Sequence, residues 1–160
     1  MSDALITEDI VVTRLFDAPV EHVWRAWTTD ENVRRWWGPA HFTAPAANMD
    51  VRTGGTSLVC MRSPDGQDFW MTWDYTHVVL RERIEYVQNL SDAAGQPIDP
   101  TSVGMGPDFP HDVATIVTLV PEAGKTRVTI SEHTTTSAFM MKMSKLGLEQ
   151  CMDKMDMIFA

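Results

Sequence analysis

The segment of residues 137–159 constrains the fold most, because it is long, amphipathic and free of proline. At helical spacing, one of its faces collects apolar and small side chains while the opposite face collects charged ones. The first face comprises Met141, Ser144, Leu148, Cys151, Met152, Met155 and Phe159, and the second comprises Lys142, Lys145, Glu149 and Asp153. The segment therefore predicts a long helix whose apolar face needs a covering surface.

Extended segments precede this helix. Residues 6–16 are rich in β-branched side chains and lack glycine and proline, which favours a strand. Turn signals at residues 53–55, 64–66 and 122–125 then separate further segments that have the composition of strands. These segments are residues 57–62, 68–80, 83–90, 112–120 and 126–133. Their order predicts an antiparallel meander.

Two short helices are predicted between the first strand and the meander. Pro19 suits the first position of a helix, and apolar residues follow it at helical spacing as far as Trp27. Thr28 and Glu31 form an S/T-x-x-E capping box, which predicts that a second helix begins there and ends before Gly38.

Residues 91–111 are rich in glycine, proline and aspartate. A loop of this length in a compact domain usually serves as a lid or a binding loop, so we expect it at the mouth of a cavity.

Composition limits the partners. The chain has 13 Lys and Arg against 22 Asp and Glu, and its net charge of −9 argues against nucleic acid and anionic membranes. No apolar run reaches the roughly 18 residues that a membrane span needs. Cys60 and Cys151 lack metal-ligand spacing, and the first ten residues lack the layout of a signal peptide. We therefore expect a cytoplasmic protein that forms one domain over residues 1–160.

These elements predict an α+β fold, in which a curved antiparallel sheet wraps around the long C-terminal helix. Four stretches also resemble a known family: TRLFDAPVEHVWRAWTTDENVRRWWGPAHFTAP, VRTGGTSLVCMRSPDGQDFW, RERIEY and GKTRVTIS. They are similar to bacterial homologues of the activator of the heat-shock protein 90 ATPase, a branch of the START-like (SRPBCC) superfamily, over residues 11–159. The resemblance implies a helix-grip fold that encloses a hydrophobic cavity. Such families include ligand carriers, polyketide cyclases and a co-chaperone domain, so the fold alone does not select an activity.

Three positions depart from the pattern of these relatives. Trp73 stands where they tend to have a small residue, and His77 stands where they often have glutamate. Leu148 follows Gly147 where they usually have a Gly-Trp pair. We expect Trp73 to limit the size of the cavity.

The candidate cavity residues follow from strand alternation and from the helix face. Alternation over residues 68–79 places six side chains on one face, although Trp70 interrupts the pattern; they are Phe69, Met71, Trp73, Tyr75, His77 and Val79. An ordinary packed core explains the same residues equally well. The candidate ligand cavity comprises Trp37, Phe42, Phe69, Met71, Trp73, Tyr75, His77, Val117, Glu132, Met141, Leu148 and Met152. Eleven methionines favour a permissive apolar cavity, since thioethers adapt to varied shapes.

Polar side chains give weaker signals. Glu132 shares strand parity with Val128 and Ile130 and is expected to point inward, where a carboxylate needs a partner or a raised pKa. A structural role is favoured over catalysis for Glu132, and no cofactor or metal motif is present. The leading hypothesis is binding of a small hydrophobic or amphipathic molecule. A cyclase- or hydrolase-type enzyme using His77 or Glu132, a co-chaperone-like interaction domain, and a homodimer remain open alternatives.

Overall fold

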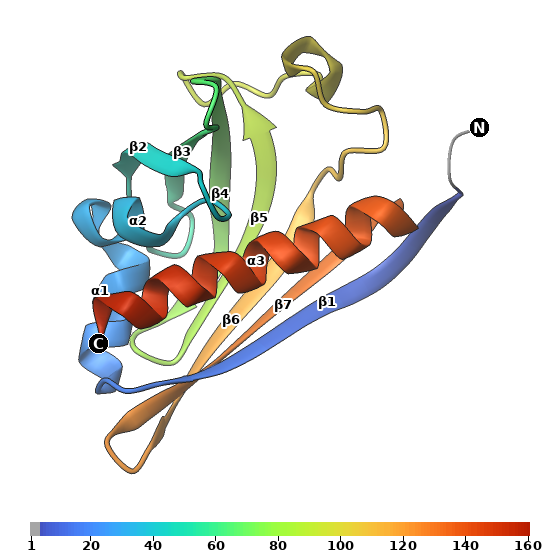
Figure 1. Cartoon of the computed structure of the whole chain (residues 1–160). Coiled ribbons are helices and arrows are strands. Elements are labelled where there is room, and N and C mark those ends of the chain that lie inside the picture. The colour runs from blue at the N-terminus through green and yellow to red at the C-terminus, as the bar shows by residue number, and fades with distance from the viewer. Residues whose placement is uncertain (1–3) are drawn as a thin grey trace.

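A single antiparallel sheet of seven strands, crossed by one long helix, forms the framework of the protein (Figure 1). The computed structural model describes residues 4–160. The elements are β1 (Leu5–Phe16), α1 (Val20–Thr28), α2 (Asp30–Trp36), β2 (Thr43–Asn48), β3 (Thr56–Arg62), β4 (Asp68–Val79), β5 (Arg83–Ser91), a 3₁₀ turn (Pro100–Val103), β6 (Val113–Glu122), β7 (Lys125–Ser137) and α3 (Ala138–Ile158). The strand order is β1-β7-β6-β5-β4-β3-β2. The predicted α+β helix-grip fold is confirmed.

Strand β1 forms one edge of the sheet and pairs with β7 along its whole length. The register runs from Leu5 opposite Ser137 to Phe16 opposite Thr126. Helix α3 begins directly after β7, and the Ser137 hydroxyl accepts a hydrogen bond from the Met140 amide, which caps the helix. The chain thus turns back at once, and α3 lies across the face of the sheet, as Figure 1 shows.

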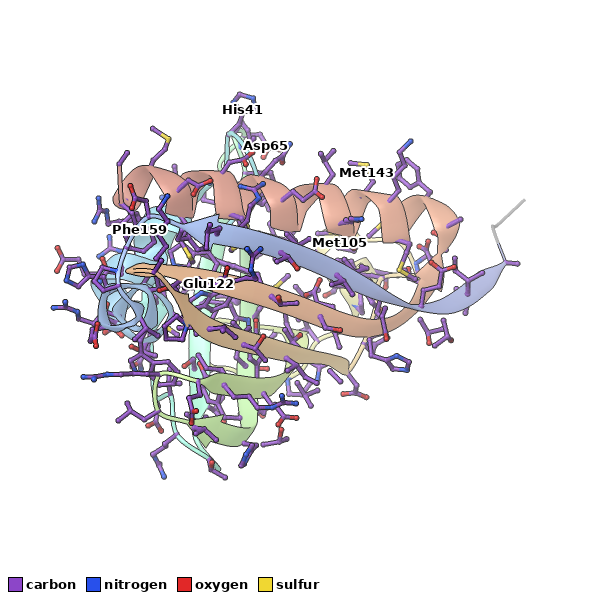
Figure 2. The ribbon with its side chains drawn as sticks, turned by 90° about the horizontal axis from the view of Figure 1, so that it is seen from below. His41, Asp65, Met105, Glu122, Met143 and Phe159 are labelled. Carbon is purple, nitrogen blue, oxygen red and sulfur yellow. The ribbon has the colours of Figure 1, made fainter. Side chains whose placement is uncertain are left out.

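The long helix is anchored through its buried face. Met141, Cys151, Met152 and Met155 are buried there, as predicted from their spacing. At its carboxyl end, the ring of Phe159 packs edge-on against Phe16 at a centroid distance of 5.6 Å (Figure 2). None of the helices within residues 4–160 is long and apolar enough to cross a membrane.

Helices α1 and α2 fill part of the space over the sheet with tryptophans. Trp27 and Trp36 are fully buried, their ring centroids lie 4.6 Å apart, and the Trp36 indole donates to the Ala26 carbonyl. The predicted capping box at Thr28 is wrong. Thr28 ends α1, where its hydroxyl donates to the Trp24 carbonyl, and α2 begins after Thr29.

Strand β4 contains a bulge that the alternation did not predict. Its pairing with β5 shifts register between Tyr75 and His77, which leaves Thr76 as the extra residue. Beyond the bulge, each side chain of β4 points to the face opposite to the one that simple alternation predicts. His77 is therefore exposed, and Val78 packs against the core instead.

Strand β2 was not predicted. Its sequence, TAPAAN, has few β-branched residues and contains Pro45, which a strand tolerates only at an edge or at a bulge. The structure satisfies both conditions, since β2 is an edge strand and its register shifts between Thr43 and Ala46.

Candidate functional site

A pocket of about 220 Å³ lies between the sheet, the first half of α3 and two connecting segments. The sheet contributes residues from β1 and from β3 to β7, while the turn after α2 and the end of the long loop supply the other walls. The lining residues are Ile10, Trp37, Gly38, Pro39, Met61, Met71, Gln88, Asn89, Leu90, Phe109, Pro110, Val113, Glu132, Thr134, Met140, Met143, Ser144, Gly147, Leu148 and Cys151.

The wall of the pocket is mostly apolar and rich in sulfur. Met61, Met71, Met140 and Met143 contribute flexible thioethers, which adapt to ligands of different shape. Met143, which Figure 2 labels on α3, is 44% exposed and belongs to the lining of the pocket. Such a wall suits an apolar molecule without selecting one shape.

The turn after α2 is tied to α3. Gly38 has a φ of +98°, and a Cβ atom there would lie 3.1 Å from the Cβ atom of Phe42, so both conformation and space favour glycine. The Lys154 ammonium donates to the carbonyls of Gly38 and Phe42 at 2.8 and 3.0 Å. The Gln150 side chain accepts from the Ala40 amide. These bonds hold one wall of the pocket against the helix.

Glu132 is the charged group of the pocket. Burial raises the pKa of its carboxyl group to about 7. Protein atoms surround the side chain on most sides, but it remains partly exposed because it borders the pocket. Among the lining residues that the structure describes, no lysine, arginine or histidine is present to neutralise this carboxylate.

The other titratable groups near Glu132 stay uncharged at neutral pH. Burial raises the pKa of the Cys151 thiol to about 12 and raises the pKa of the Tyr86 hydroxyl well above its ordinary value. The charge inside the pocket therefore follows the protonation of Glu132.

Two buried polar atoms of lining residues lack a hydrogen-bond partner among residues 4–160. They are the indole nitrogen of Trp37 and the hydroxyl oxygen of Thr134. The indole nitrogen of Trp27, which lies outside the lining of the pocket, is also unpaired, so such atoms are not confined to the pocket wall.

Trp73 lies behind the wall of the pocket. It is 1% exposed and stacks on Tyr86 at a centroid distance of 4.9 Å, and its indole donates to the Gln88 side chain. Trp37 packs edge-on against it at 5.1 Å. Trp73 therefore supports Trp37 and Gln88, which do line the pocket.

The structure brings together four of the twelve candidate cavity residues: Trp37, Met71, Glu132 and Leu148. Tyr75 is instead buried, with its hydroxyl bonded to Ser57, and His77 is exposed. The remaining candidates are buried or half-buried in the core outside the lining set, namely Phe42, Phe69, Trp73, Val117, Met141 and Met152.

Some missed residues had a signal in the sequence. Thr134 shares parity with Glu132 on β7, and Gly147 precedes Leu148 on α3. The long loop was expected at a cavity mouth, and the structure places Phe109 and Pro110 in the pocket wall. Gln88 and Asn89 gave no such signal, because adjacent residues of one strand are expected to face opposite sides.

Comparisons with known proteins agree with the architecture. A family model described as "Activator of Hsp90 ATPase homolog 1-like protein" matches residues 17–160. A crystal structure of a protein from Chromobacterium violaceum has a TM-score of 0.77 at 23% identity, covering 94% of this chain and 96% of that chain. A crystal structure of a protein from Mycobacterium smegmatis has a TM-score of 0.73 at 20% identity, covering 100% and 98%. The solution structure of an AHSA1-like protein from Aeromonas hydrophila has a TM-score of 0.68 at 18% identity, covering 94% of both chains. A search of curated proteins gave no match.

Proposed function

This chain belongs to the Activator of Hsp90 ATPase homolog 1-like family, and from that premise we propose that it binds a small hydrophobic or amphipathic molecule in the pocket between the sheet and α3. The pocket itself carries the proposal. It is concave and mostly apolar with a few polar groups, as small-molecule sites usually are. The polar side chains of Glu132 and Ser144 in the lining support a ligand that has a polar end.

The size of the pocket sets the size of the ligand. An apolar cavity of about 150 Å³ takes up benzene, so a pocket of about 220 Å³ suits a molecule slightly larger than one aromatic ring. A phenyl ring with a short alkyl chain and one polar end group has these dimensions.

The neutral probe 4-phenylbutanol tests the proposal. In ¹H–¹⁵N spectra of the labelled protein, we expect saturable shifts concentrated at amides of lining residues such as Met61, Leu90 and Gly147. Gly147→Leu provides a blocked pocket. A Cβ atom at this position meets only the Pro39 Cβ atom, at an ordinary 3.7 Å, and leucine favours helix more than glycine does. Affinity should fall about tenfold or more in this variant, since the added side chain occupies ligand volume.

Lys145→Leu is the matched control, because it adds the same side chain at an exposed position of the same helix. It should bind 4-phenylbutanol as the wild type does. Shifts scattered over the surface, or equal affinity in Gly147→Leu and wild type, would contradict binding in this pocket.

A second candidate function is general acid–base catalysis by Glu132. The observation that favours it is the pKa of about 7 for a carboxyl group that borders the pocket. Within residues 4–160, the lining of the pocket contains no second carboxylate and no histidine or lysine, and His77 is exposed beyond the bulge of β4. Binding therefore remains the function that the site supports best.

A further inference from the structure

The distribution of charge around the pocket is one-sided. Glu132 contributes a carboxylate, while the remaining lining residues within 4–160 are apolar or carry neutral polar groups. The whole chain has a net charge of −9, so the long-range field also attracts cations. An anionic ligand would meet repulsion both on approach and inside the site.

We infer that the pocket selects amphipathic amines, with the ammonium group paired to the Glu132 carboxylate and the apolar body against the methionines and Leu148 of the wall. This inference rests on the proposed function, since it names the ligand class of the same pocket. The indole ring of Trp37 in the wall adds a face that attracts cations.

Energetics favour an amine over a neutral ligand of the same shape. Folding has already removed most of the water around the Glu132 carboxyl group, so an arriving cation gains attraction at a small further desolvation cost on the protein side. An alcohol offers one hydrogen bond to the same group, and a bond between two charged groups is the stronger of the two. The difference in binding free energy between the two ligands measures this preference.

The surroundings of Glu132 make the preference dependent on pH. Tyr86 of β5 and Cys151 of α3 are the titratable groups that act on it, and both stay neutral at pH 5–9 because burial raises their pKa values. The paired residues on the neighbouring strands, Ile10 of β1 and Thr115 of β6, do not titrate. Protonation of Glu132 alone therefore removes the negative charge from the pocket.

Three matched probes test the inference by isothermal titration calorimetry: 4-phenylbutylamine, 4-phenylbutanol and 4-phenylbutyrate. At pH 8 we expect the amine to bind the wild type at least about tenfold more tightly than the alcohol, and the carboxylate to bind most weakly. Between pH 8 and pH 5.5 the affinity for the amine should fall while the affinity for the alcohol stays constant. In Glu132→Gln the ratio of amine to alcohol affinity should fall to about one.

Glu8→Gln is the matched control. It removes the same charge from an exposed position on the adjacent strand β1, so it should keep the wild-type ratio. Equal affinities for amine and alcohol in the wild type, or a preference that survives Glu132→Gln, would overturn the inference while leaving the binding function intact. Failure of a folded wild type to bind any of the three probes would overturn both.

Discussion

At the residue scale, Glu132 determines how charge and stability are linked in this protein. Its pKa is about 7 in the folded state against about 4.5 in a free chain, so the folded state holds the proton more tightly. The resulting contribution of Glu132 to the free energy of unfolding is present below pH 4.5 and is lost as the pH rises through 7. A shift of this size corresponds to about 3 kcal/mol.

Glu132→Gln should remove this dependence. We expect the variant to match the wild type near pH 4.5 and to be more stable at pH 8, by up to about 3 kcal/mol. Urea unfolding of both proteins at pH 4.5, 6, 7 and 8 measures the difference, with Glu8→Gln as the exposed control. A difference that stays constant across this range would show that the carboxyl group titrates as it does in the unfolded chain.

Trp73 contributes chiefly through packing. Trp73→Ala should lower the free energy of unfolding by about 3–5 kcal/mol, because it removes a fully buried ring and leaves the Gln88 side chain without its donor. The half-buried Trp24 gives the matched control, and Trp24→Ala should cost clearly less. Equal losses in the two variants, measured by urea unfolding, would contradict a central role for Trp73. On the structure, Trp73 limits the pocket only through Trp37 and Gln88.

At the scale of elements, the hydrogen bonds of Lys154 join α3 to the turn after α2. Lys154→Met keeps most of the side-chain volume but removes both donors to the Gly38 and Phe42 carbonyls. We expect a loss of about 1–2 kcal/mol and faster hydrogen exchange at the Phe42 amide, which bonds to the Pro39 carbonyl. Lys145→Met, on the exposed face, should change neither quantity. Unaltered exchange in Lys154→Met would show that other contacts hold the turn.

The elements also show where sequence reasoning succeeded. The strong periodicities of α3 and of most strands could be read directly, because burial on one face imposes a repeat on the sequence. The bulge at Thr76 could not be predicted, because nothing in a run such as YTHVV marks one extra residue. That residue nevertheless reverses which face of the sheet each later side chain of β4 points to. Strand β2 was missed because its composition is that of a loop and pairing with β3 alone makes it a strand.

At the scale of the whole molecule, the candidate site was harder to predict than the fold. The sequence predicts which face of β4 is covered, but does not reveal what covers it. Trp27 and Trp36 fill the part of this face near Trp73, and so the pocket forms at the other end, beside Met71. Residues on the covered face thus divide into core and pocket wall according to contacts between distant segments, which a local pattern does not contain.

The pairing of β1 with β7 also affects the nascent chain on the ribosome, because β1 must remain unpaired until β7 has been synthesised. Strand β1 precedes the other described strands in the chain, whereas its only strand partner in the described fold, β7, follows all of them. At typical elongation rates β1 waits on the order of ten seconds with its backbone groups unpaired. Glu8, Asp9 and Arg14 lie on this strand, and charges on an open edge discourage pairing with other nascent chains. We therefore expect these charges to limit aggregation of the chain until β7 emerges and pairs with β1.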